Sequence, residues 1–141
     1  MTELEQKDSK MISVIVVKPG EMPVLKEIER KLETMQEIVG GYIEQVCPFD
    51  DCVSLICNEE GKLCGLSPNR SLKNEKGEIY DIIAGTFFIA YSPPDSENFE
   101  PLPENLAEKY INEFKYPEFF LYRNGKIDSF KIFSDENSNV S

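Results

Sequence analysis

The order of apolar and polar residues in the first forty positions predicts a strand, a turn, a second strand and a helix. Residues 12–17 (ISVIVV) form an unbroken, mostly β-branched run, which is typical of a buried strand. Pro and Gly at 19–20 predict a turn, and residues 23–28 alternate like a hairpin partner. Apolar residues then recur at helical spacing, so we expect a first helix over residues 29–39, ended by Gly40.

The middle of the chain predicts short strands joined by turns. Residues 42–46 and 53–57 have the composition of strands, and residues 62–66 are expected to continue as a strand beyond the turn at 58–61. Residues 67–77 are polar and rich in turn formers, so we expect a loop there.

The second half predicts a central strand, a helix and a hairpin. Residues 79–91 are the most apolar segment and are expected to form one central strand, with Gly85 as a bulge or a point of close backbone approach. A proline-rich loop follows at 92–103, then a helix at 103–115. Asn and Gly between two aromatic-rich runs predict a hairpin over residues 118–133.

Together these elements predict a small α+β fold. We expect a mixed, mainly antiparallel sheet with one main helix packed on it, and a second helix plus a hairpin near the C-terminus. Most connections are too short for the helical crossovers of a parallel sheet. We expect a flexible N-terminus over residues 1–10, a single domain over 11–133 and a disordered tail over 134–141.

Composition narrows the classes of partner and the compartment. The net charge of the 141 residues is −11 and the pI is near 4.5, which argues against direct binding to nucleic acid or to an anionic membrane. The sequence has no apolar run long enough to span a membrane and no apolar stretch near its start that resembles a secretion signal. We therefore expect a cytoplasmic protein, and its oligomeric state is left open.

The candidate chemistry is sparse. The chain has no histidine, and its four cysteines form no CxxC pair. We therefore expect reduced thiols, no metal and no other cofactor. A cysteine nucleophile would lack its usual imidazole base, and the adjacent carboxylates Asp50 and Asp51 do not by themselves make an acid–base pair. We expect no catalytic residues and a non-enzymatic protein.

Four blocks of sequence carry a family resemblance. They are residues 32–44 (LETMQEIVGGYIE), 58–63 (NEEGKL), 66–70 (LSPNR) and 80–89 (YDIIAGTFFI). In this order and spacing the chain resembles the uncharacterised DUF3846 domains of phages, plasmids and conjugative elements of Gram-positive bacteria.

The resemblance implies a family-like core over residues 12–91, with the helix and hairpin of residues 103–133 lying beyond it. It also implies a bacterial host cytoplasm that contains a mobile element. Accessory proteins of such elements often inhibit host enzymes or host defence, so the resemblance favours an accessory protein of this kind by analogy.

One functional hypothesis is binding to a host protein. Glu29, Glu33 and Glu37 lie four residues apart and would form an acidic row on the first helix. Such a row can dock on a basic surface of a host protein and inhibit it. The alternative is an ordinary solvated helix face.

The second hypothesis is sequestration of a small anionic or nucleotide-like ligand. Residues 61–94 carry a net charge of +1 in a chain of −11. An arginine fork can hold a phosphate, and a tyrosine can stack on a base. The alternative is that Arg70 pairs with Asp81 or Glu44 and fixes a loop. The predicted ligand-binding residues are Asn69, Arg70, Tyr80, Lys62 and Tyr42.

Overall fold

A five-stranded antiparallel sheet forms the centre of the computed structural model, which describes residues 10–133. The strand order is β2-β1-β7-β4-β3. The sheet comprises β1 (Met11–Val17), β2 (Val24–Glu29), β3 (Ile43–Val46), β4 (Val53–Asn58) and β7 (Phe87–Tyr91).

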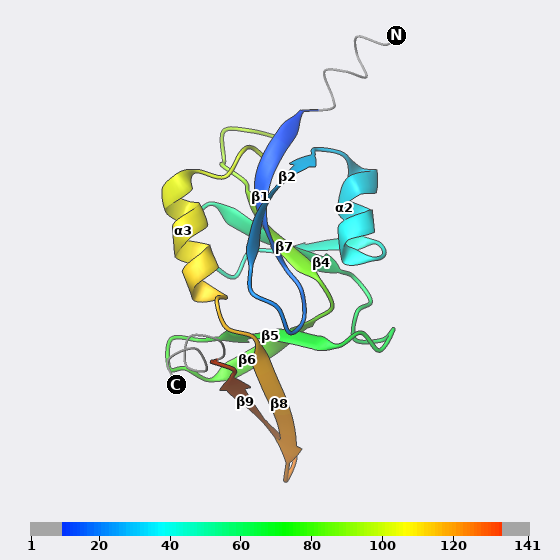
Figure 1. The fold of residues 1–141 in the computed structure, drawn as a ribbon, viewed down its shortest axis with the longest axis vertical. Coiled ribbons are helices and arrows are strands. Elements are labelled where there is room, and N and C mark those ends of the chain that lie inside the picture. Colours follow the sequence, from blue (N-terminus) through cyan, green and yellow to red (C-terminus); the bar gives the residue numbers. More distant parts are fainter. Residues whose placement is uncertain (1–9, 134–141) are drawn as a thin grey trace, which may run out of the picture.

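The two helices of the described residues cover opposite faces of this sheet (Figure 1). Along β1, Ile12, Val14 and Val16 contribute to the core beneath α2 (Leu32–Val39). Ile15 and Val17 belong to the core beneath α3 (Glu104–Glu113). Because both faces of β1 are buried, the strand is apolar at nearly every position rather than at alternate ones.

Two separate hairpins lie beyond the five-stranded sheet. The first joins β5 (Pro68–Lys73) to β6 (Ile79–Ala84), and the second joins β8 (Glu118–Arg123) to β9 (Lys126–Lys131). Figure 1 shows the β8–β9 hairpin projecting from the end of the molecule where β5 and β6 lie. Its turn residues Asn124 and Gly125 both have positive φ, 52° and 75°, as the Asn-Gly pair predicts.

The predicted α+β class, with its mainly antiparallel sheet and C-terminal hairpin, is confirmed. The predicted start of the first helix is wrong by three residues. Glu29 instead ends β2, where it pairs with Met11 of β1, next to the pair of Ile28 with Ile12. The helical spacing of apolar residues therefore begins inside a strand, and pairing with β1 decides the conformation.

Residues 62–77 contain the largest error of the sequence interpretation. Residues 62–66 were expected to be a strand, but residues 61–65 form a turn in which Cys64 N donates to the carbonyl of Glu60 and Leu66 N to that of Gly61. Residues 67–77, expected to be a loop, contain β5. The polar composition of β5 predicts a solvated loop, but its residues Asn69, Arg70 and Ser71 are buried.

The predicted central strand over residues 79–91 is two strands in different sheets. Gly85 separates β6 from β7 with a φ of +84°, which residues with side chains rarely adopt. The apolar pattern continues through the break because both strands contribute to buried cores, so periodicity alone does not reveal it.

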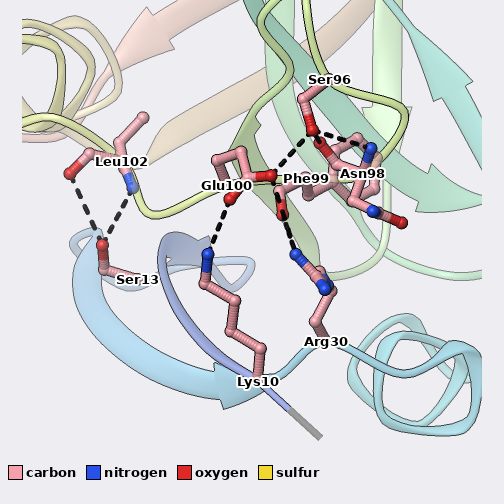
Figure 2. A network of polar contacts seen from close by, with 8 residues as sticks. All are labelled: Lys10, Ser13, Arg30, Ser96, Asn98, Phe99, Glu100 and Leu102. Carbon is pink, nitrogen blue, oxygen red and sulfur yellow. Dashed lines mark hydrogen bonds and ion pairs between the residues drawn. The ribbon is translucent and has the colours of Figure 1, made fainter. Parts of the chain in front are cut away.

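A polar network fixes the proline-rich loop of residues 92–103 to the first two strands (Figure 2). Glu100 accepts hydrogen bonds from Lys10 at 2.8 Å and from the Ser96 hydroxyl at 2.7 Å, and Arg30 donates to the Phe99 carbonyl at 3.3 Å. The hydrogen bonds from Lys10 and Ser96 lower the pKa of Glu100. This network holds the chain in place just before α3 begins.

The predicted flexible N-terminus lies outside the described residues except for Lys10, which forms this ion pair. The predicted tail over residues 134–141 also lies outside them. Neither helix in residues 10–133 is long and apolar enough to cross a membrane.

Candidate functional site

Arg70 lies in the interior with no exposed surface, and all five of its N–H donors are used within the protein. Nε and Nη2 donate to the carbonyl of Phe114 at 3.2 and 2.9 Å, and Nη2 also donates to the carbonyl of Glu21 at 2.6 Å. Nη1 donates to the side-chain and backbone oxygens of Asn69 at 2.8 and 3.4 Å. Burial lowers the pKa of Arg70, and the nearby Glu118 partly offsets this.

Asn69 is equally buried and equally occupied. Its amide nitrogen donates to the carbonyl of Val17 at 2.9 Å and to that of Gly85 at 2.8 Å. Together, Asn69 and Arg70 join the end of β1, the break between β6 and β7, and the end of α3. The structure therefore gives these two residues no free donor for a phosphate, and the alternative pairing of Arg70 with Asp81 or Glu44 is also wrong.

Lys62 and Tyr80 do come together, in a groove of about 700 Å³ between β6 and the β8–β9 hairpin. Lys62 forms an ion pair with Asp81 at 2.6 Å at the side of this groove. Tyr42 is exposed but does not line it. The groove is otherwise mainly apolar, and its lining includes three hairpin residues that the sequence interpretation did not select: Phe120, Tyr122 and Ile127.

The predicted acidic row is broken in the structure. Glu33 and Glu37 are exposed on α2, but Glu29 lies at the end of β2 and contacts Lys31 at 3.8 Å. Two glutamates one helical turn apart remain, which is an ordinary feature of a solvated helix.

The outer face of the β8–β9 hairpin is the more unusual surface. Side chains alternate between the two faces of a strand, and directly opposed residues share a face. Phe119 pairs with Phe130 and Leu121 with Asp128, so these four residues share the face opposite the groove. Phe119 is 52% exposed and Phe130 is 47% exposed. We call Phe119, Leu121 and Phe130 the outer face.

The hairpin is anchored at its base by Glu118. Its Oε1 accepts hydrogen bonds from the backbone N–H of Ser71 at 3.1 Å, from the hydroxyl of Ser71 at 2.7 Å and from the hydroxyl of Ser129 at 2.6 Å. The two bonds from Ser71 connect β8 to β5, and the bond from Ser129 connects β9 to β8, so Glu118 ties the base of the hairpin to the rest of the protein.

The hairpin also differs from the rest of the described chain in charge. Residues 115–133 contain four basic and two acidic side chains, a net charge of +2. Residues 10–114 contain ten basic and nineteen acidic side chains, a net charge of −9. The apolar outer face therefore belongs to a basic segment carried by an acidic body.

Two groups in the described residues, the Cys57 thiol and the Tyr110 hydroxyl, have raised pKa values. Burial, together with the neighbouring carboxylates of Glu44 and Asp81, raises the pKa of Cys57 to about 11, so its thiolate is scarce at neutral pH. Burial and a hydrogen bond to Asp51 raise the pKa of Tyr110 above its usual range. Within residues 10–133 no three His, Cys, Asp or Glu side chains cluster as metal ligands would.

The family match is longer than the resemblance in the four sequence blocks indicated. A family model described as "Domain of unknown function (DUF3846)" matches residues 12–115. The chain belongs to the DUF3846 family. The match includes α3, so the DUF3846 domain contains both helices, and it ends just before the β8–β9 hairpin. No curated protein and no solved structure matches the chain.

Proposed function

We propose that this DUF3846 protein is a non-enzymatic binding protein that docks on a partner protein through the outer face of its β8–β9 hairpin. The observation that carries the proposal is that Phe119, Leu121 and Phe130 share one exposed face of a hairpin that Glu118 anchors to β5. Aromatic side chains dominate the binding energy of many protein interfaces, whereas exposed apolar clusters are unfavourable unless they are used.

The hairpin supports this role better than the acidic surface expected on the first helix. That surface is reduced to Glu33 and Glu37, two charges in water. The hairpin combines apolar area, a defined orientation and a local charge opposite to that of the body. It also lies beyond residue 115, where the family match ends.

Binding is favoured over catalysis by the chemistry of the described groups. The chain contains no histidine, the buried thiol of Cys57 has a raised pKa, and the hydroxyl of Tyr110 is engaged with Asp51. None of these groups is poised to move a proton near pH 7. The family resemblance favours an accessory protein of a phage or other mobile element, with a host protein as the target of inhibition.

The experiment is affinity capture from a Gram-positive bacterial lysate at low salt. We expect the unaltered protein to retain one partner in stoichiometric amount. The combined variant Phe119→Ser, Leu121→Thr and Phe130→Thr should lose it, and the control Glu33→Lys, Glu37→Lys should keep it. If only the glutamate variant lost the partner, the docking surface would lie on α2, and the proposal would be contradicted.

The groove beneath the hairpin favours a second candidate, the sequestration of a small ligand. Its volume of about 700 Å³ is in the range of small-molecule sites, and it brings Lys62 and Tyr80 together. Native mass spectrometry of gently isolated protein would reveal a retained ligand of a few hundred daltons. Such a ligand should be lost in Tyr80→Ala but kept in Tyr42→Ala, because Tyr42 lies outside the groove lining.

A further inference from the structure

One backbone edge of the hairpin is open in the part of the chain that the structure describes. The N–H of Ile132 donates to the carbonyl of Pro117 at 2.7 Å. This hydrogen bond shows which residues of β9 direct their backbone groups toward β8. Because hydrogen-bonded and non-hydrogen-bonded pairs alternate along an antiparallel ladder, Ile127, Ser129 and Lys131 direct their N–H and C=O groups away from β8. Within residues 10–133, β9 pairs with β8 alone.

This open edge has the length and the chemistry to accept another strand. β9 is six residues long, and a two-stranded sheet gains stability when a third strand joins it. Phe130 of β9 lies on the outer face, so a strand added at this edge would extend the apolar surface that Phe119 and Leu121 begin. Backbone hydrogen bonds would then supply affinity, and the alternating side chains would supply selectivity.

The charges on β9 indicate what kind of strand fits. Lys126 and Lys131 lie at its two ends, on opposite faces of the strand, with Asp128 between them. An added strand would have its own side chains beside these two lysines, where carboxylates are favoured. The net charge of +2 over residues 115–133 would attract an acidic segment from a distance.

We propose that the partner supplies an extended, net-acidic segment with interspersed apolar residues, which adds to the open edge of β9 as a third strand. This rests on the proposed function and specifies the chemistry of the partner at the same surface. A second copy is less suited, because it would bring one +2 hairpin against another. Nucleic acid is less suited because the body of residues 10–114, at −9, would repel it.

The test uses two capped eight-residue peptides as probes, one alternating valine with glutamate and the other alternating valine with lysine. The full-length protein is labelled with ¹⁵N, and each peptide is titrated into it. The glutamate peptide should shift the backbone amide NMR signals of Ile127, Ser129 and Lys131. Its affinity should be at least about tenfold higher than that of the lysine peptide. The double variant Lys126→Glu, Lys131→Glu should reverse this preference.

Two variants at one position isolate the backbone contribution. Ser129→Pro removes an N–H that points away from β8, while Ser129→Ala removes only the hydroxyl that donates to Glu118. We expect binding to be lost in the proline variant and kept in the alanine variant. Persistent proximity of Phe119 and Phe130 in the proline variant, measured by nuclear Overhauser contacts, would show that the hairpin still forms.

Equal affinity for both peptides, or unchanged binding after Ser129→Pro with the hairpin intact, would overturn the proposal. Concentration-dependent dimerisation at this edge without peptide would overturn it in favour of a second copy. If affinity capture still depends on the outer face while the glutamate peptide fails to bind, strand addition is wrong and the docking surface stands. If the capture itself does not depend on the outer face, the proposed function fails.

Discussion

The guanidinium of Arg70 donates two hydrogen bonds to the carbonyl oxygen of Phe114, the residue that caps the C-terminal end of α3. The two residues are 44 positions apart in sequence. This contact fixes the end of α3, from which the chain continues directly into the β8–β9 hairpin (Figure 1). A buried arginine thus fixes the point from which the hairpin begins, and Glu118 then ties the hairpin to β5.

Replacing Arg70 should destabilise the protein strongly. Arg70→Gln would leave the buried carbonyl of Phe114 without its donors, at a cost of about 1–3 kcal/mol, and would also remove the hydrogen bond to the part-buried carbonyl of Glu21. We expect the free energy of unfolding to fall by roughly 3 kcal/mol or more, measured by urea denaturation. Arg70→Lys should also be destabilising, because an ammonium cannot reproduce the five-donor fork.

The matched control is Arg123→Gln. Arg123 is exposed. Within residues 10–133 its guanidinium contacts Asp128 alone, at 3.3 Å. Its loss should cost no more than about 0.5 kcal/mol, as exposed ion pairs contribute little. Similar losses for both arginines would contradict the structural role of Arg70.

Arg70 also shows where the sequence interpretation reached its limit. Arg70 is a candidate ligand-binding residue by sequence, but a sequence does not distinguish a buried arginine that binds carbonyls from an exposed one that binds phosphate. Its partners Glu21 and Phe114 are 49 and 44 positions away, so no local pattern indicates them. β5 escapes a prediction from sequence for the same reason, because the polar side chains of Asn69, Arg70 and Ser71 are satisfied inside the protein.

Elements determined by local signals were predictable. The hairpin at Asn124–Gly125 needed only a turn that accepts positive φ between two apolar runs, and α3 needed only its helical periodicity. The division of residues 79–91 was not, because the strands on either side of Gly85 are both mainly apolar. The groove and the outer face were also missed, since each depends on how the hairpin packs against β5 and β6.

The four thiols should differ in reactivity. Cys47, Cys52 and Cys64 are exposed, whereas Cys57 is buried and its pKa is raised to about 11. Native protein treated with a chromogenic disulfide reagent at pH 8 should therefore label three thiols rapidly and the fourth only after unfolding. Four equally fast thiols in the native state would contradict the buried position of Cys57.

Stability should decline in acid, in part through Asp51 and Glu100. Hydrogen bonds from Lys109 and Tyr110 lower the pKa of Asp51, and those from Lys10 and Ser96 lower that of Glu100, from ordinary values of 3.8 and 4.5. A carboxylate whose pKa is lower in the folded than in the unfolded state stabilises the protein. This contribution is complete when the pH is above the unfolded-state pKa, and it is lost as the pH falls through the folded-state pKa.

The corresponding experiment compares urea denaturation at pH 7 and pH 3 for the unaltered protein and for the combined variant Asp51→Asn, Glu100→Gln. The variant should be less stable at pH 7 and should lose less stability on acidification. Glu104→Gln, which alters an exposed carboxylate in the first turn of α3, serves as the control. An identical pH dependence in variant and unaltered protein would show that neither carboxylate contributes.

Changes at the anchor residue Glu118 should reduce stability, whereas changes on the outer face should not. Glu118→Ala would remove the acceptor for Ser71 and Ser129, and we expect a loss of about 1–3 kcal/mol because the buried N–H of Ser71 loses its partner. The outer-face variants should change the free energy of unfolding by less than about 1 kcal/mol, since they remove little buried area. A large loss on changing the outer face would assign those residues to folding instead.

The most direct test of the docking surface is site-specific photocrosslinking in bacterial cells. A benzophenone amino acid would replace one of three residues: Phe119 on the outer face, Phe120 on the face of the hairpin that lines the groove, or Glu33 on α2. The proposed function predicts one discrete covalent adduct from position 119 and none from position 33, with position 120 giving far less. An adduct from position 33 alone, or equal adducts from all three positions, would contradict the assignment of the outer face as the binding surface.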